Sequence, residues 1–460
     1  MATADIKSYA ASGQVGTTKH PKGLYVLFAT EMWERFSFYT MIAMFALYMR
    51  DPTGQGFSWS VDDTQALYSN YIMFVYFSPL VGGWIADKKI GYRKAVMIGG
   101  LFFMAGHLLL SIRSIGVVYA ALTCLVIGNG FFKPNVSAMV GNLYSEGSHL
   151  KDRAYNIFYM GINVGAFLAP VVAEFVKSRF GFHPAFAVAA VGMAISISIL
   201  WKWKKHIEAA ERPASRGPKT LANVAAVTVD APPASVSNQR AIEAVPDWKR
   251  VVALLVIFLI VIVFWMVFHQ NGTTITYWGN DNTNWKVTGI ISNAINPAWV
   301  ILLTFPVITF WRWLDKKGLE PSTPTKMVFG MVLTSLAFFV FFIAAKIGEA
   351  SVPPGGDPYA FRMSPLWLLG AYGVLTAGEL MLSPMGLSLV SKVAPVRVRG
   401  IMMGGWFVAT GLGNKLTQIG QLWDDWLHST FWIFCSACAL VMAFVLLILL
   451  RPLKKAMPGV

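Results

Sequence analysis

Apolar residues recur along the whole chain in long runs, each close to the length needed to cross a lipid bilayer. A hydrocarbon core about 30 Å thick is spanned by roughly 20 helical residues. Twelve such runs occur, at residues 23–49, 64–86, 95–112, 117–140, 153–176, 183–203, 250–278, 287–311, 327–345, 364–391, 400–423 and 429–450. The pattern predicts an all-α polytopic membrane protein with twelve transmembrane helices.

One polar segment separates these runs into two groups of six. Residues 204–247 are rich in Ala, Pro, Ser and charged residues, a composition that neither spans a bilayer nor buries a core. The first 22 residues lack the apolar region of a cleaved signal peptide, so we expect no signal peptide. The expected organisation is a cytoplasmic tail (1–22), a six-helix bundle (23–203), a flexible cytoplasmic linker (204–247), a second six-helix bundle (248–452) and a cytoplasmic tail (453–460).

Two short turns in the two groups resemble each other. Asp87-Lys88-Lys89 follows the second run and Asp315-Lys316-Lys317 follows the eighth, and a glycine comes soon after each. A repeat of this kind favours an internal duplication, as in transporters that rock one bundle against another around a central site. The alternative is that two basic turns at the same membrane face look alike because topology requires it.

Basic residues are distributed unevenly around the runs. With a cytoplasmic N-terminus, 28 Lys and Arg residues fall in cytoplasmic segments and 7 in outer loops. This positive-inside asymmetry predicts that both termini are cytoplasmic and that the protein lies in a cell membrane. The net charge of +15 is therefore mainly a topology signal. Binding to nucleic acid is not expected, because no soluble module gathers the charge on one face.

Residues 29–40, ATEMWERFSFYT, place three charged side chains inside the first run. An ionisable residue at bilayer depth costs roughly 2.5 to 3.5 kcal/mol on insertion scales, so it normally faces a partner or a water-filled cavity. Glu31 and Arg35 are four residues apart and share a helix face, and Glu34 flanks that face. Since a structural ion pair needs only one acid, the second carboxylate indicates either another cation or a bound proton.

Other runs contain two further candidates. Lys133, in GNGFFKPN, precedes Pro134, and we expect a distorted helix and a lysine that is either held by a carboxylate or uncharged. Glu379, in GELMLSPMGLS, lies near mid-run, and we expect Pro384 to interrupt its helix. Such a carboxylate is typical of a cation or ammonium site; a protonated carboxyl bonded to a neighbouring helix is the alternative. Two cations in one half and an anion in the other suit a zwitterion such as a short peptide.

Motifs for catalysis or metal binding are lacking. The chain has no H-E-x-x-H, no G-x-S-x-G and no pair of aspartates in a catalytic spacing, so we do not expect an enzyme. Cys124, Cys435 and Cys438 lie in apolar runs without the partners of a metal or redox site, and we expect them to pack. Lys415 is the remaining basic residue inside a run, and no role is assigned to it.

Five separated stretches resemble one family of transporters. Glu31-x-x-Glu34-Arg35-Phe36 resembles the ExxERF motif of the proton-coupled oligopeptide transporter (POT/PTR) family, which has the major facilitator fold. The stretches GGWIADKKIGYRKAVMIGG, YNIFYMGINVGAF, GNGFFKPN and GELMLSPMGLS are similar to other motifs of that family. The resemblance implies symport of di- and tripeptides with protons by alternating access. It also implies a monomer in the lipid bilayer that needs no cofactor beyond the coupling proton.

The resemblance also implies roles for individual residues. Arg35 and Lys133 would meet the peptide carboxylate, and Glu379 would meet its amino group. Side chains that would hydrogen-bond the peptide backbone are Tyr39, Tyr76, Asn163 and Asn296. Trp406 would wall a side-chain pocket. The proton-coupling cluster would consist of Glu31, Glu34, Arg35 and Lys133.

Three positions depart from the family pattern. Phe38 stands where a tyrosine is usual, His269 stands where an acid precedes glutamine in span seven, and Ile42 replaces an arginine of span one. In the family that arginine and that acid pair as an outer gate. We therefore hypothesise that the outer gate closes by apolar packing. His269 is either a titrating group that takes part in proton coupling or a neutral histidine bonded within the bundle.

A carrier of another substrate on the same fold is the alternative function. A drug/proton antiporter or an anion carrier, for example of nitrate, would keep the ExxER motif. Such a carrier would not need a carboxylate at Glu379, so that residue separates the two interpretations.

Overall fold

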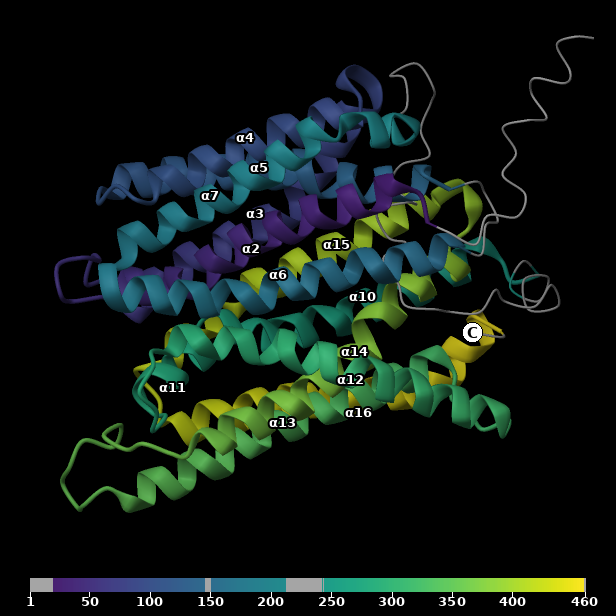
Figure 1. Ribbon diagram of the computed structural model, residues 1–460. Helices are drawn as coiled ribbons and strands as arrows, with labels where there is room; N and C mark the ends of the chain where they lie inside the picture. Colours follow the sequence, from purple (N-terminus) through teal and green to yellow (C-terminus); the bar gives the residue numbers. More distant parts are fainter. Residues whose placement is uncertain (1–19, 145–149, 212–241, 243, 459–460) are drawn as a thin grey trace, which may run out of the picture.

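The computed structural model describes residues 20–144, 150–211, 242 and 244–458, and all regular secondary structure in these ranges is helical (Figure 1). Thirteen α-helices are present there: α2 (Lys22–Arg50), α3 (Val61–Ile85), α4 (Tyr92–Leu109), α5 (Ile115–Asn142), α6 (Leu150–Phe180), α7 (Phe182–Lys202), α10 (Asp247–Phe268), α11 (Thr274–Asp281), α12 (Ser292–Lys316), α13 (Thr323–Ser351), α14 (Pro365–Val393), α15 (Arg399–Leu416) and α16 (His428–Ala456). Short 3-10 or π segments are η1 (Ala86–Ile90), η2 (Lys204–Ala210), η3 (His269–Gly272), η4 (Gly289–Ile291), η5 (Val396–Val398) and η6 (Thr417–Trp423). The predicted all-α class is confirmed.

Eight stretches of the described chain are long and apolar enough to cross a bilayer. They are α5, α6, α7, the segment from α10 to α11, the segment from η4 to α12, α13, the first part of α14, and α16. Each of the twelve predicted runs overlaps one of the long helices. Helix α2, which carries the three charges, is not among the eight.

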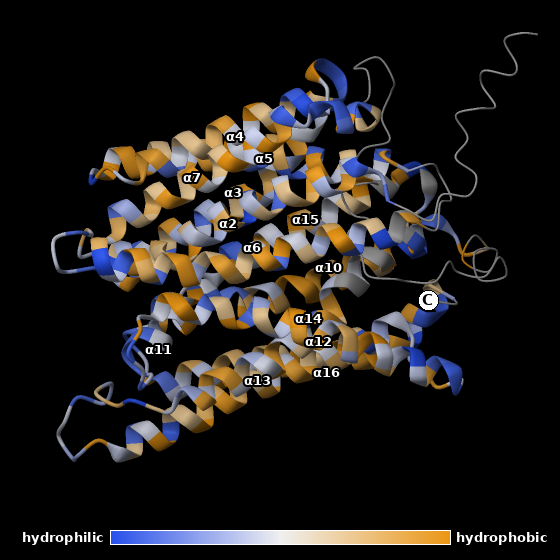
Figure 2. Ribbon diagram, viewed as in Figure 1, coloured by the Kyte–Doolittle hydropathy of each residue, from blue (hydrophilic) through white to orange (hydrophobic). Residues whose placement is uncertain are grey.

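The helices lie side by side, so their connections gather at two ends of the bundle (Figure 1). We call distal the end that carries residues 51–60, 269–291, 352–364 and 417–427, and proximal the opposite end, where the C-terminus lies. Figure 2 shows hydrophilic residues concentrated at both ends and hydrophobic residues along the helices between them. This distribution matches a bundle whose middle faces hydrocarbon.

Buried apolar side chains form two clusters. One consists of residues between Leu24 and Ala210 together with Ile290, and the other of residues between Ala253 and Met457 together with Ala46 and Val61. Helices α2 to α7, the first half, thus pack mainly on one another, as do α10 to α16, the second half. The main helix contacts between the halves join α3 to α15 and α6 to α12.

The two Asp-Lys-Lys turns end on glycines with a positive φ. Gly91 has φ 80° and Gly318 has φ 67°, a region that side chains other than glycine rarely adopt. In the first turn the Tyr92 hydroxyl also donates to Asp87 at 2.7 Å. The shared glycine conformation explains why both turns need this residue.

The described ends of the expected linker are helical. Lys204–Ala210 forms η2, with Ile207 and Ala210 buried, and Asn142 donates to the Ala210 carbonyl at 3.1 Å. Helix α10 already begins at Asp247. The rest of the expected linker, residues 212–241 and 243, lies outside the described residues.

Prolines do not end their helices as expected. Helix α14 continues through Pro384, so the predicted interruption is wrong, and α5 likewise continues as an α-helix through Pro134. In a bundle, neighbouring helices and local adjustment satisfy the backbone groups that a proline frees.

The predicted run 250–278 is broken instead. Helix α10 ends at Phe268, and η3 and α11 follow. The Gln270 side chain donates to the carbonyls of Met266 at 3.2 Å and Thr417 at 3.1 Å. Gly272 approaches the Tyr68 hydroxyl so closely that a Cβ atom would lie 1.9 Å from it. Glycine favours helix poorly, and this contact holds the chain in the break.

Candidate functional site

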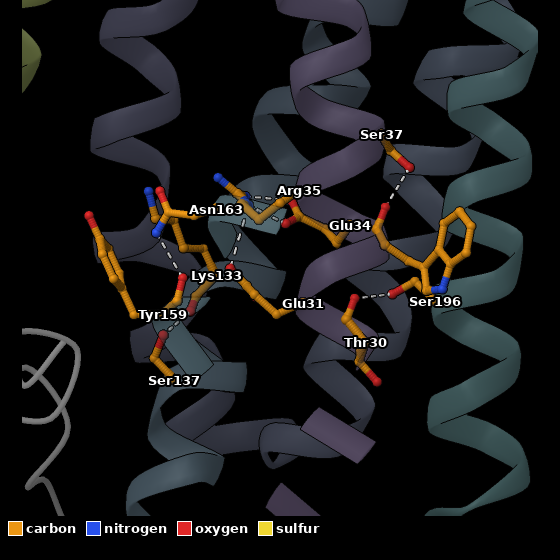
Figure 3. A network of polar contacts seen from close by, with 11 residues as sticks. Thr30, Glu31, Glu34, Arg35, Ser37, Lys133, Ser137, Tyr159, Asn163 and Ser196 are labelled. Carbon is orange, nitrogen blue, oxygen red and sulfur yellow. Dashed lines mark hydrogen bonds and ion pairs between the residues drawn. The ribbon is translucent and has the colours of Figure 1, made fainter. Parts of the chain in front are cut away.

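Helix α2 carries a buried ion pair between neighbouring residues. Arg35 Nε lies 2.5 Å from Glu34 Oε2, and Arg35 Nη2 donates to Glu34 Oε1 at 2.5 Å, so the pair is bidentate (Figure 3). Glu31 is more distant, with Oε1 3.4 Å from Arg35 Nε. All three residues are at most 3% exposed. The second carboxylate inferred from the sequence is therefore Glu31, which lies one turn away.

Close packing of α6 against α2 fixes the position of these charges. A Cβ atom on Gly165 would lie 2.3 Å from the Met32 carbonyl and 3.2 Å from the Arg35 Cβ. On another side, the Ser196 hydroxyl of α7 donates to the Thr30 carbonyl at 2.7 Å. Glycine thus lets two backbones meet beside the ion pair, which leaves the charged side chains no room to turn toward lipid.

Lys133 enters the same polar cluster from α5 (Figure 3). Its Nζ lies 5.3 Å from the centroid of the Tyr76 ring, a cation–π distance. Among the described residues it makes no ion pair with Glu31 or Glu34. Of the alternatives drawn from the sequence, a lysine held by a carboxylate is therefore not what this structure contains.

His269 lies next to Tyr76 from the second half. The two rings are 6.2 Å apart, and His269 stacks on Trp265 at 4.8 Å. His269 Nδ1 is 3.2 Å from the Trp265 carbonyl, and because a carbonyl only accepts, Nδ1 donates in this contact. The histidine is hydrogen-bonded within the bundle, and this contact fits both interpretations because Nδ1 can donate in the neutral and in the charged ring.

The second half contributes a carboxylate held by neutral donors. Asn296 Nδ2, on α12, donates to Glu379 Oε2 of α14 at 2.9 Å and to Thr376 Oγ1 at 3.0 Å. No cation pairs with Glu379 among the residues that the structure describes. The arrangement leaves a partly buried carboxylate that is oriented but not neutralised.

Tyr39 lies one helical turn from Arg35 on α2. Phe38 lies beside it, and the Arg35 guanidinium is 4.9 Å from the centroid of the Phe38 ring. The ring that replaces the usual tyrosine therefore contacts the arginine by cation–π interaction, without a hydroxyl.

Asn163 lines a cavity between the halves. Its amide donates to the Tyr159 carbonyl at 2.9 Å, and both residues face a cavity of about 200 Å³ between α6 and α12. The cavity continues toward the proximal end, where Arg312 lines it. Apolar side chains of α12, among them Val300 and Phe305, form the opposite wall.

Three other singled-out residues lie away from this cluster. Trp406 is 2% exposed and packs over Gly386, where a Cβ atom would lie 1.8 Å from its ring. Ile42 is buried in the apolar core of the first half. Lys415 donates to Gln418 at 2.6 Å.

Reasoning from sequence missed three residues of the site. Tyr159 is one turn from Asn163 and Thr376 is one turn from Glu379, so helical spacing from a known candidate could have found both. Nothing in the local sequence marks Arg312, because it lies among basic residues at a helix end. No cluster of three or more His, Cys, Asp or Glu side chains that could hold a metal occurs in the described ranges.

Known proteins resemble this chain over most of its length. A family model described as the POT family matches residues 93–232 and 219–425. A protein named "Di-/tripeptide transporter" from Lactococcus lactis subsp. lactis is 30% identical over 496 residues, which covers 96% of this chain and 97% of the relative. An uncharacterized transporter of Bacillus subtilis, YclF, is 29% identical over 503 residues, which covers 100% of both.

Solved structures resemble the fold over almost its full length. The crystal structure of a peptide transporter POT in complex with sulfate has a TM-score of 0.81 and 28% identity, and covers 98% of this chain and 99% of its own. A mutant peptide transporter POT in complex with alafosfalin has a TM-score of 0.81, 28% identity and 99% coverage of both chains. The chain therefore belongs to the POT family.

Proposed function

We propose that this chain is a proton-coupled symporter that imports di- and tripeptides through a cell membrane by alternating access. Relatives named as di-/tripeptide transporters over nearly the full length support this substrate class. We further propose that it acts as a monomer and needs no cofactor besides the coupling proton.

Twelve long helices, α2 to α7, α10 and α12 to α16, would cross the membrane as two six-helix bundles. The proximal end, where α2 and α10 begin and α7 and α16 end, would face the cytoplasm, because basic residues are enriched there. The distal end would then face outward. The bundles would correspond to residues 23–203 and 248–452 in a major facilitator arrangement.

The observation that carries this proposal is the pair of opposite charge sites in the two halves. Arg35 and Lys133 would bind the peptide carboxylate, and Glu379 would bind the amino group. Asn163 of the first half and Val300 of the second line one cavity, which supports a common space between the halves. The peptide backbone would hydrogen-bond to Tyr39, Tyr76, Asn163 and Asn296. Trp406 would reach a side-chain pocket only if α15 moves relative to α14.

Glu31 is the carboxylate that we propose to carry the proton. Glu34 is engaged twice by Arg35, whereas Glu31 Oε2 has no hydrogen-bond partner among the described residues. A buried charged oxygen without a partner is costly, and protonation removes that cost. With Glu31 protonated, Lys133 is free to hold the peptide carboxylate. Deprotonation after inward release would let Lys133 pair with Glu31 and reset the carrier.

Uptake of a labelled dipeptide into liposomes with an imposed pH gradient tests the function. We expect accumulation when the outside is acidic and its collapse when a protonophore is added. Uptake no greater than that of protein-free liposomes would exclude peptide symport.

The same assay separates peptide transport from another substrate on this fold. Unlabelled dialanine should compete with the labelled dipeptide, and Glu379→Ala should remove that competition. A drug/proton antiporter or an anion carrier would respond to neither change.

A further inference from the structure

We infer that Glu174 is a positioning residue of the outer gate, whose carboxylate binds Thr288 across the two halves and thereby seats Ile290 as a plug. The inference rests on the proposed transport function, because a gate has meaning only in a carrier. The contact between Glu174 and Thr288 would hold the outer end closed, and the sequence did not predict it.

The contact between Glu174 and Thr288 is buried and uses both carboxylate oxygens. Glu174 Oε1 accepts from the Thr288 backbone N–H at 2.9 Å, and Oε2 accepts from the Thr288 hydroxyl. Glu174, on α6, is only 8% exposed. Hydrogen bonds to an ionised acceptor are stronger than those between neutral groups. One residue of the second half thus satisfies a buried charge of the first half.

Two residues further along, Ile290 is inserted into the first half. It is 0% exposed and belongs to the apolar cluster formed by residues between Leu24 and Ala210. Between Thr288 and this plug, Gly289 lies so close to the Thr276 carbonyl that a Cβ atom would be 2.1 Å from it. The tight turn therefore links the position of Ile290 to that of Thr288.

Other contacts close the same end. Ala46 and Val61 of the first half lie in the apolar cluster of the second half. Arg50 lies over the Tyr277 ring at 4.4 Å and is 3.5 Å from Asp424. Toward the proximal end, a cavity lies between α6 and α12. The structure is thus closed outward, and opening outward requires Thr288 to leave Glu174.

Glu174 contributes more to this closure than the exposed ion pair. The side chains of Arg50 and Asp424 are 25% and 54% exposed, and exposed pairs contribute little free energy. In the POT family an arginine and an acid pair as the outer gate. Ile42 and His269 stand at those two positions here, so no ion pair forms between them. Among the described residues at this end, Glu174 makes the contact between the halves in which the charged group itself is buried.

Thiol labelling in intact cells tests the inference without any peptide. Ala46→Cys reports on the interface between the halves, because Ala46 is 1% exposed and packs with the second half. The three native cysteines are replaced by alanine. We expect Glu174→Leu to speed labelling by an external, membrane-impermeant maleimide about ten-fold or more, because it removes two charge-assisted hydrogen bonds and the loss of one already corresponds to about that factor.

A matched control exists within the second half. Glu349 accepts from the Ser429 backbone N–H at 2.8 Å and from its hydroxyl at 2.7 Å, so the two hydrogen bonds are of the same kind but both partners belong to one half. The exposed Lys346 lies 3.6 Å from Glu349 as well. Glu349→Leu should leave the labelling rate within about two-fold of the parent. Equal acceleration by both substitutions, or no acceleration by Glu174→Leu, would overturn the inference.

A second pair of variants covers the case in which Glu174→Leu does not fold. Thr288→Val removes the hydroxyl donor and should speed labelling several-fold, whereas Thr288→Ser keeps the donor and should not. Equal labelling rates for Thr288→Val and Thr288→Ser would also overturn the inference. Because labelling needs no substrate, a failed gate is distinguishable from a wrong assignment of peptide transport.

Discussion

The two halves hold their buried carboxylates in different ways. In the first half, Glu34 is paired with Arg35 of the same helix through two contacts of 2.5 Å. In the second half, Glu379 is oriented by the neutral amide of Asn296 and has no cation beside it among the described residues. A charge compensated within its own helix stabilises structure, whereas a charge that is oriented but uncompensated can bind a cation supplied by a ligand.

The largest effect on transport is expected from removing Lys133, the lysine of the first half. Lys133→Ala should abolish proton-driven accumulation of a dipeptide, because Arg35 is already engaged by Glu34 and Lys133 is the other cation in the described polar cluster around Glu31. Uptake into liposomes under a pH gradient measures the effect. Lys415→Ala is the matched control, since that lysine donates to Gln418 outside the polar cluster and should not be needed. Accumulation at the parent level in Lys133→Ala contradicts the assigned role.

Neutralising the uncompensated carboxylate should have the next largest effect. Glu379→Gln keeps the shape of the side chain but removes its charge. We expect uptake to fall about 100-fold, because a hydrogen bond to a charged group contributes up to roughly 3 kcal/mol. The loss should appear in KM, since binding of the amino group is affected. Glu349→Gln, a carboxylate of the same half at the distal end, should not change KM.

An N-acetylated dipeptide sharpens this test. It lacks the ammonium group, so the parent should bind it weakly, and Glu379→Gln should discriminate little between it and the free dipeptide. Full discrimination in the variant would place the amino group elsewhere.

Loss of Glu34, the carboxylate that is paired with Arg35, should instead lower the stability of the protein. Glu34→Gln leaves the Arg35 guanidinium without its bidentate partner and should lower the free energy of unfolding by about 2 kcal/mol, because Glu31 at 3.4 Å replaces only part of the contact. Glu31→Gln should cost less than about 1 kcal/mol. Thermal unfolding in detergent compares the two. The reverse order would mean that Glu31, not Glu34, holds the arginine.

The smallest effect concerns a charge outside the proposed spans. Burial raises the pKa of Asp424, between α15 and α16, and nearby Arg50 opposes this shift more weakly. The folded protein therefore holds that proton more tightly than the unfolded chain does. Stability should fall as pH rises from about 4, the ordinary pKa of aspartate, through the higher folded value.

Asp424→Asn should remove this dependence of stability on pH. The variant should be slightly more stable than the parent at neutral pH, by less than about 1 kcal/mol because the group is half exposed. Thermal unfolding between pH 4 and neutral pH, about the window set by the ordinary and raised values, measures the difference. Asp425→Asn, one residue away, removes the same charge but keeps Asp424 and should retain the slope.

Local pattern was sufficient for the parts of the protein that depend on one helix. Apolar runs of bilayer length placed every long helix, since burial in hydrocarbon imposes length and composition directly. The spacing of Glu31, Glu34 and Arg35 placed them on adjoining faces of α2, and the short motifs identified the family. These features follow from helical periodicity and from residue chemistry, which are present in any short stretch of chain.

Contacts between helices were decided only by the tertiary structure. Whether Arg35 pairs with Glu34 or with Glu31 depends on how α6 packs against α2 beside Gly165. The break after α10 depends on Tyr68, and the clamp between Glu174 and Thr288 joins residues 114 positions apart. Spacing along a helix fixes which face a side chain occupies, but the partner on that face comes from another part of the chain. Packing of the two halves selects it.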